Sequence, residues 1–315
     1  MKLSRPIVEG YLQESREIGQ QYRLYDMHVH PFELLLKPIN YSDDPAVPGV
    51  LSVHNSKYRK PSAKEIDLTP PAELCAADSQ KSGQLSLQAL MAYRQTGATV
   101  LADRMTLSGI GACMLLPVPM TRERVDQDLQ LLERLQDADS TRFMYAVGVP
   151  AEITDPQAFL HLICRLFSPR AVKIHPNFAG IDLGSAEGRQ WMTNVLSAAS
   201  GSSLPSIVHG GRSILLPNGG ISSYACMKNL LAVDWAASEQ PVVISHAGAF
   251  GCSLEETTNS VLPGIKELFA RHPHLRVDTA GLSYPVLLEV LKQLGPERVL
   301  FGSDELYFPQ WQSMA

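Results

Sequence analysis

The chain has 315 residues, 45% of them hydrophobic and 19% charged, which is the composition of a globular protein with a large core. A net charge of -5 and a pI near 6.0 argue against nucleic acid or an anionic membrane as a partner. No apolar run in the sequence has the length of a membrane span or of a signal-peptide core. The five cysteines are scattered and form no Cys-x-x-Cys pair, so we expect a cytoplasmic protein with reduced thiols. Its expected partner is a small-molecule substrate, and a homodimer is left open.

The first part of the chain combines a helix, a strand and a long irregular stretch. Apolar residues at helical spacing predict a surface helix over 6–20, within an N-terminal segment 1–22. A strand is predicted at 23–29. Residues 31–84 are rich in Pro, Ser, Asp and Lys, so we predict an insertion over the end of that strand. It would serve as a lid or a subunit contact, or else form a peripheral loop without a catalytic role.

Beyond residue 85, apolar strands alternate with helical segments. Eight strands separated by helices predict a parallel sheet that closes into a (β/α)8 TIM barrel, with residues 1–315 as a single domain. An open dinucleotide-binding sheet is disfavoured, because no Gly-x-Gly-x-x-Gly follows the first strand. Strands are predicted at 23–29, 112–118, 142–149, 170–175, 205–210, 241–247, 274–279 and 297–302, and the later helices at 86–96, 99–108, 122–138, 156–167, 186–199, 222–238, 255–271 and 285–294.

The first strand carries a His-x-His pair at its end. Side chains alternate faces along a strand, so Asp26, His28 and His30 point to one side. Both imidazoles can then reach one ion, and Pro31 ends the strand. The pair alone does not separate a metal site from two incidental histidines.

Polar side chains also end later strands. Lys173 and His175 share one face at the end of 170–175, His209 follows the next strand, and His246 and Asp304 end two others. Because the carboxyl ends of barrel strands meet at one mouth, we expect these side chains to gather with the His-x-His pair. Active sites of TIM barrels lie at this mouth.

Together these segments resemble the motif series of the amidohydrolase superfamily, and most closely its amidohydrolase-related group of metal-dependent hydrolases and non-oxidative decarboxylases. The resemblance runs in order from residue 23 to residue 304. It implies a barrel of the metal-dependent hydrolase type, with one divalent metal ion and with His246 beside the ion as the acid/base. The implied metal ligands are His28, His30, His209 and Asp304, and the motifs that carry the resemblance are Asp26-Met27-His28-Val29-His30-Pro31, Val172-Lys173-Ile174-His175-Pro176, Ile207-Val208-His209-Gly210, Ile244-Ser245-His246-Ala247-Gly248 and Phe301-Gly302-Ser303-Asp304.

The donor set bears on the metal and on the chemistry. Three imidazoles and one carboxylate suit Zn²⁺, with Mn²⁺, Fe²⁺ or Co²⁺ as alternatives. Such an ion can activate water near pH 7, and His246 or Asp304 would accept the proton and return it to the leaving group.

Three further residues are predicted to contact substrate. In some branches of the superfamily a lysine at the place of Lys173 becomes a carbamate that bridges two metal ions, so a binuclear site is an alternative to a substrate contact. His175 lies nearer the mouth, where it would bind substrate or order a water. Arg212 would clamp a substrate carboxylate, or else form an exposed salt bridge.

Other features receive supporting roles. Asp278 ends the seventh strand and is expected to support the site indirectly. Surface or packing roles are expected for the remaining histidines, His54, His161, His272 and His274. Because the sequence stops at Ala315, we expect helix 6–20 to cover the seam between the last and first strands, with Ile7, Tyr11 and Ile18 packed on the barrel.

Three functions fit this pattern. The leading one is a metal-dependent hydrolase that cleaves an amide, lactone or related C–N or C–O bond of a small organic molecule. The alternative is a non-oxidative decarboxylase or hydratase of an aromatic or unsaturated carboxylic acid, which would use the same ligands. The third is a barrel that binds a ligand without catalysis.

Overall fold

The computed structural model describes residues 5–30, 98–118, 121–213, 220–305 and 310. The predicted insertion at 31–84, the helix predicted at 86–96 and the histidine at position 54 lie outside this part of the chain. A single domain over 1–315 therefore stays a prediction.

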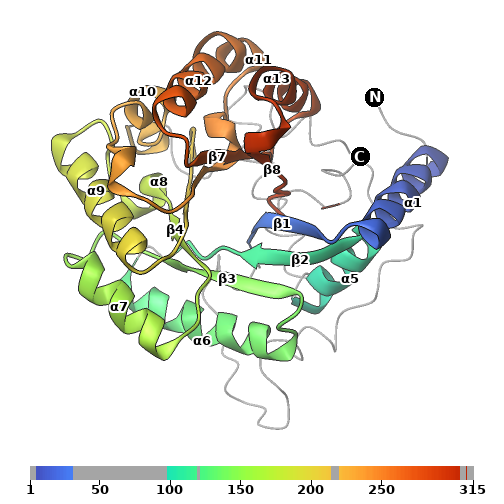
Figure 1. Ribbon diagram of the computed structural model, residues 1–315, viewed down its shortest axis with the longest axis horizontal. Coiled ribbons are helices and arrows are strands. Elements are labelled where there is room, and N and C mark those ends of the chain that lie inside the picture. Colours follow the sequence, from blue (N-terminus) through green and yellow to red (C-terminus); the bar gives the residue numbers. More distant parts are fainter. Residues whose placement is uncertain (1–4, 31–97, 119–120, 214–219, 306–309, 311–315) are drawn as a thin grey trace.

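Eight parallel strands form one sheet in the order β1-β2-β3-β4-β5-β6-β7-β8, which confirms the predicted TIM barrel (Figure 1). All eight predicted strands are present, and each is shorter than predicted. They span Leu24–Val29 (β1), Ile110–Leu115 (β2), Phe143–Gly148 (β3), Ala171–Ile174 (β4), Ser206–Val208 (β5), Val242–Ile244 (β6), Leu275–Asp278 (β7) and Val299–Leu300 (β8).

The barrel is closed between its last and first strands by three backbone hydrogen bonds. The amide of Met27 donates to the Phe301 carbonyl at 3.0 Å, that of Asp304 to the His28 carbonyl at 2.9 Å, and that of His30 to the Glu305 carbonyl at 2.8 Å. All three bonds lie beyond the end of β8, which is at Leu300. The closure therefore brings Asp304 against the His28–His30 pair.

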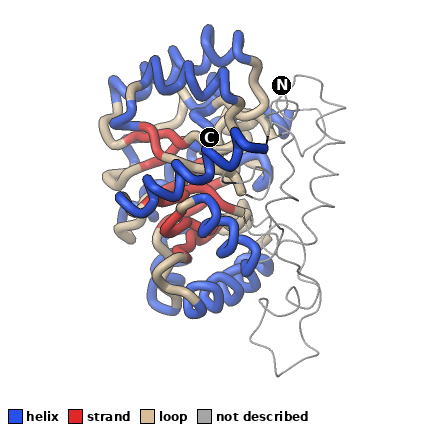
Figure 2. Tube along the Cα trace, turned by 90° about the vertical axis from the view of Figure 1, so that its right-hand side faces the viewer, coloured by secondary structure: helices blue, strands red, loops and turns tan. Residues whose placement is uncertain are grey.

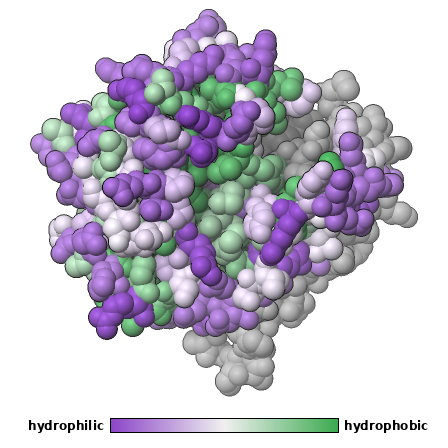
Figure 3. Space-filling view, in the orientation of Figure 1, coloured by the Kyte–Doolittle hydropathy of each residue, from purple (hydrophilic) through white to green (hydrophobic). Residues whose placement is uncertain are grey.

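Helices surround the strands (Figure 2). The main apolar core lies between the strands and the helices, and a smaller cluster that includes Met114, Leu116 and Val243 packs separately. Hydrophilic side chains cover most of the face seen in Figure 3. The described helices are α1 (Arg5–Gln21), α5 (Ala98–Ser108), α6 (Arg122–Ala138), α7 (Pro156–Leu166), α8 (Pro176–Ala179), α9 (Ala186–Gly201), α10 (Met227–Leu230), α11 (Leu254–Glu256), α12 (Leu262–Arg271) and α13 (Tyr284–Leu294). None of them is both long and apolar enough to cross a bilayer.

Two predicted helices differ in detail. Residues 222–238 do not form one helix: α10 ends at Leu230, and a short 3₁₀ turn follows at Trp235–Ala237. The indole of Trp235 is buried and donates to the Leu230 carbonyl at 2.9 Å, which satisfies the open end of α10. Between α11 and α12, residues Thr257–Val261 form a π-helical segment.

The prediction for α1 is wrong in its location. The helix packs against α5 and β2, rather than over the seam between β8 and β1. Its buried side includes Leu12 and Ser15, whose hydroxyl donates to the Ser108 carbonyl, whereas Tyr11 and Ile18 are each 39% exposed. Burial of Ile7 falls outside the described side chains. Gly19 on α1 and Gly109 just after α5 allow the two helices to approach this closely. Helical periodicity does not reveal such a tertiary contact.

Gly109, just after α5, is expected to be sensitive to substitution. Its φ is 73°, and an added Cβ would lie 2.5 Å from the Ser15 carbonyl oxygen. Gly109→Ala should therefore lower the free energy of unfolding by about 2 kcal/mol, measured by denaturant titration. Gly10→Ala is the matched control, because no atom lies within 4 Å of its added Cβ on α1. The control should be neutral or stabilising. Equal effects of both changes would contradict the close packing.

Candidate metal centre

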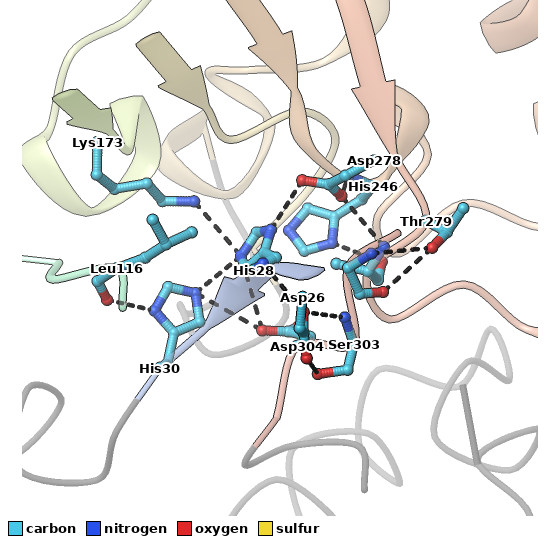
Figure 4. Close-up of polar contacts among 12 residues, drawn as sticks. Asp26, His28, His30, Leu116, Lys173, His246, Asp278, Thr279, Ser303 and Asp304 are labelled. Carbon is cyan, nitrogen blue, oxygen red and sulfur yellow. Dashed lines mark hydrogen bonds and ion pairs between the residues drawn. The ribbon is translucent and has the colours of Figure 1, made fainter. Parts of the chain in front are cut away.

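The candidate centre lies at the carboxyl ends of the strands (Figure 4). His28 comes from β1 and Lys173 from β4, whereas His30 directly follows β1, His246 follows β6 and Asp304 follows β8. Exposed fractions of these five side chains lie between 0% and 5%. The expected gathering at one mouth is thus observed for these residues.

The hydrogen bonds of His28 and His30 define their tautomers. Nδ1 of His28 lies 3.0 Å from Oδ2 of Asp278, and Nδ1 of His30 lies 2.7 Å from the Leu116 carbonyl oxygen. A carboxylate and a carbonyl only accept, so both Nδ1 atoms carry the hydrogen. Burial lowers the pKa of both imidazoles well below the usual value, which keeps them neutral.

The two Nε2 lone pairs then face each other at 2.9 Å. Two acceptors at this distance repel, unless a cation lies between them. Each histidine is also held through its other nitrogen, as is usual for metal-ligating histidines. The pair therefore fits a metal ion.

Asp304 supplies a third donor. Its Oδ1 lies 3.8 Å from Nε2 of His28 and 3.6 Å from Nε2 of His30, is buried, and has no hydrogen-bond partner. Burial raises the pKa of the carboxyl group, since a charge is costly there without a cation. His28, His30 and Asp304 thus form a candidate metal site, with ligand atoms within 4.8 Å of one another.

The fourth predicted ligand, His209, lies outside this group. Its Nε2 is 3.2 Å from the Arg212 carbonyl oxygen, to which it donates, so Nδ1 is the nitrogen that could bind an ion. The ring stacks on that of His175, with centroids 3.9 Å apart, and its centroid is 4.9 Å from that of His246. The structure brings three of the four predicted ligands together and places His209 beside His246.

His246, the predicted acid/base, lies beside His28. Its Nδ1 donates to the Ala280 carbonyl at 2.8 Å, which leaves Nε2 as the acceptor, and its ring centroid lies 4.8 Å from that of His28. Burial lowers the pKa of His246 to about 4, although Asp278 opposes this shift. Asp278 also accepts from the His246 amide at 2.7 Å. The carboxylate of Asp278 thus holds both histidines, which confirms its supporting role.

The three predicted substrate residues have different surroundings. Lys173 is 1% exposed, its Nζ lies 3.5 Å from Nε2 of His28, and burial lowers its pKa. No carboxylate of the described residues forms an ion pair with it. Nδ1 of His175 accepts from the Phe178 amide at 3.4 Å, so its Nε2 carries the hydrogen. Arg212 forms an exposed salt bridge with Glu256 at 2.7 Å, which is the second of the two alternatives predicted for it.

Sequence reasoning missed a buried network below the centre. Asp26 accepts hydrogen bonds from Ser303 and from Gln310, and Glu305 pairs with Arg104. The only signal was that Asp26 shares a strand face with the two histidines. Its partners follow β8 and lie far away in the sequence, so no local pattern indicates them.

Comparisons with known proteins agree with this architecture. A family model described as Amidohydrolase matches residues 25–314. A search of the curated proteins found no match. Similar solved structures include 5-carboxyvanillate decarboxylase from Novosphingobium aromaticivorans, complexed with manganese and 4-hydroxy-3-methoxy-5-nitrobenzoic acid, at a TM-score of 0.56, 13% identity and coverage of 94% of this chain and 90% of that one.

Two further structures share the fold. An uncharacterised TIM-barrel protein from Bordetella bronchiseptica has a TM-score of 0.54 and 13% identity, over 78% of this chain and 86% of that one. A protein described as an amidohydrolase II has a TM-score of 0.54 and 14% identity, over 92% and 90%. At these identities the structural likeness establishes the barrel alone.

Proposed function

Because the chain belongs to the amidohydrolase family, we propose that it is a divalent-metal-dependent hydrolase that cleaves an amide, lactone or related C–N or C–O bond of a small organic molecule. The observation that carries the proposal is the convergence of two histidine lone pairs and an unpartnered oxygen of Asp304 on one buried point. Nitrogen and oxygen donors of this kind suit Zn²⁺ first, with Mn²⁺, Fe²⁺ or Co²⁺ as alternatives. The near-neutral pI and the scattered cysteines support a cytoplasmic enzyme.

The chain's own residues divide the work of such a reaction. A bound divalent ion would supply Lewis acidity, which polarises a carbonyl and acidifies water. The neutral Nε2 of His246 is available to take a proton from water and to return it to the leaving group. Asp278 and the Ala280 carbonyl keep this ring in the tautomer and orientation that the transfer requires.

Lys173 favours hydrolysis over loss of CO₂. Attack on a carbonyl carbon builds negative charge on its oxygen, and the ammonium of Lys173 is a buried donor available to stabilise that charge. In a decarboxylation, the same ammonium beside the leaving carboxylate would stabilise the charged reactant more than the neutral CO₂ that forms. It would therefore raise the barrier to that reaction. The hydrogen on Nε2 of His175 supplies a second donor for substrate.

A second candidate is non-oxidative decarboxylation or hydration of an aromatic or unsaturated carboxylic acid. Its support is the fold shared with 5-carboxyvanillate decarboxylase, which was solved with manganese and a nitrobenzoic acid. The same ligands serve both reactions. The ligands therefore do not separate the two candidates, and the products of the reaction do.

The decisive experiment profiles the metal-loaded protein against a panel of amides, lactones and aromatic acids. Release of alcohol, amine or acid without CO₂ supports the hydrolase, whereas CO₂ release supports the second candidate. A purified protein that binds no divalent metal stoichiometrically would contradict both, and would leave a ligand-binding barrel. Elemental analysis also counts the ions in each chain, and one ion per chain supports the mononuclear site. Two ions per chain, together with a carbamate carbon on Lys173 detected by ¹³C NMR, would support the binuclear alternative.

Removal of the metal is expected to affect both activity and stability. Chelation would leave the Nε2 atoms of His28 and His30 and the buried oxygen of Asp304 without the ion on which they converge, so it should abolish turnover and lower the midpoint of thermal unfolding. At an ion concentration of 100 times Kd, the expected stabilisation is about 2.7 kcal/mol. Calorimetry with and without added Zn²⁺ measures it. An unfolding midpoint that does not respond to the ion would contradict the site.

A further inference from the structure

A carboxylate without a role in the proposed chemistry lies next to the candidate centre. Asp26 precedes His28 by two residues on β1, so both side chains point to the same face of the strand. The Asp26 side chain is fully buried, and each of its hydrogen bonds within the described chain comes from a neutral donor. Buried charges without a cation are rare, so this carboxylate depends on its hydrogen bonds for stabilisation.

Asp26 accepts four hydrogen bonds, one from its own strand and three from residues far away in the sequence. Oδ1 accepts from the amides of His28 at 3.1 Å and Ser303 at 3.0 Å. Oδ2 accepts from the Ser303 hydroxyl at 2.5 Å and from Nε2 of Gln310 at 2.8 Å. Figure 4 shows Asp26 between His28 and the Ser303–Asp304 segment. One carboxylate therefore joins the first strand to the segment that carries the last candidate ligand.

The same carboxylate controls the backbone around Asp304. The Ser303 amide is held by Asp26, the Asp304 amide donates to the His28 carbonyl at 2.9 Å, and the Glu305 amide donates to the Ser303 hydroxyl at 2.9 Å. That hydroxyl in turn donates to Asp26. Asp304 has a φ of 60°, in the left-handed region that L residues seldom adopt. Such a conformation persists only where its surroundings fix it.

We infer that Asp26 is a positioning residue that holds the left-handed turn at Asp304, and thereby directs the Asp304 carboxylate toward Nε2 of His28 and His30. The inference rests on the metal-binding role that the proposed function gives to those three residues. Asp26 itself belongs to neither of the two groups of close donors found among the described residues. It acts through the backbone of the ligands on both sides of the barrel seam.

Asp26→Asn tests this role. The side chain keeps its size, but one acceptor becomes a donor that faces the amide donor of Gln310. The affinity for Co²⁺ alone, measured by competition with a chelator, should fall about 10-fold to 100-fold. The visible absorption of bound Co²⁺ should also change, because it reports the geometry of the ligands. The double variant D26N/Q310E restores the pair with donor and acceptor exchanged and keeps the total charge, so it should recover most of the affinity.

Two further variants make the test specific. Asp128→Asn makes the same chemical change at another buried aspartate, on α6, and should leave the affinity and spectrum of Co²⁺ unchanged. Ser303→Ala keeps the Asp26 carboxylate and removes only the hydroxyl that links it to Glu305. This milder variant should lose several-fold in affinity for Co²⁺. It tests the positioning role if D26N does not fold.

The outcomes separate this inference from the proposed function. A wild-type protein that binds no Co²⁺ would overturn the proposed function, and the positioning role with it. Wild-type binding together with unchanged affinity and spectrum in D26N and S303A would overturn the positioning role alone. A lower unfolding temperature in D26N without any change at the bound Co²⁺ has the same meaning, because a purely structural residue would behave in this way.

Discussion

Asp304→Asn is expected to lower the affinity for a divalent ion, and with it activity, by at least about 100-fold. The carboxylate oxygen that faces His28 and His30 has no other partner, so the amide removes the only negative charge offered to the ion by these three residues. Asn adopts the left-handed conformation as readily as Asp does, so the φ of 60° is retained. Ion content by elemental analysis and turnover of the identified substrate measure the effect.

Asp304→Ala is the companion to this variant. It loses the charge and also places a residue that disfavours the left-handed region at the strained position. We expect it to match D304N in ion affinity and to be less stable to heat. If D304N retains ion content and turnover at the wild-type level, Asp304 is not a ligand.

His246→Asn is expected to separate metal binding from catalysis. The ion affinity should stay close to the wild-type value, whereas kcat should fall by about 10²-fold to 10⁴-fold, the usual contribution of a positioned acid/base. Asn suits the φ of 59° at this position but cannot accept and return a proton near neutral pH. Ion titrations and steady-state kinetics on the same preparation test both halves.

The opposite pattern would reassign His246. A large loss of ion affinity in this variant would make His246 a ligand, in the second group of close donors that it forms with His28 and Asp278. The matched comparison is His274→Asn, since His274 precedes β7, away from the centre, and Nε2 of its ring donates to the Trp235 carbonyl. That variant should leave both ion affinity and kcat unchanged.

Periodicity predicted the strands and helices of the barrel, and the missing Gly-x-Gly-x-x-Gly and the polar strand ends decided against an open sheet. Alternating apolar strands and amphipathic helices follow from which faces each element buries, and the predicted helix 122–138 matches α6 at both ends. The prediction was wrong where tertiary packing decides the outcome. The position of α1 depends on close contact between Gly19 and Gly109, and residues 222–238 are interrupted where the buried Trp235 indole bonds to the end of α10.

The candidate centre was predictable in part for a similar reason. The barrel brings the carboxyl ends of all strands together, so polar residues at these ends are candidate site residues. His28, His30 and Asp304 were predicted in this way. The hydrogen-bond partners that orient these residues cannot be predicted from a local sequence pattern. Asp26 and Gln310 are 284 residues apart, and His28 and Asp278 are 250 apart. Nor does a motif reveal that His209 donates through Nε2, or that Arg212 is engaged by Glu256.

The closure of the barrel would couple the release of a bound ion to local opening of the seam between β8 and β1. The amides of Asp304 and His30 form two of the three backbone bonds that join the last strand to the first, and the side chains of the same residues face the ion site. Local opening of these backbone bonds would also separate the candidate metal-ligand atoms from one another. A bound ion would therefore make this opening rarer. Hydrogen exchange at these two amides should therefore respond to metal more strongly than exchange elsewhere in the barrel.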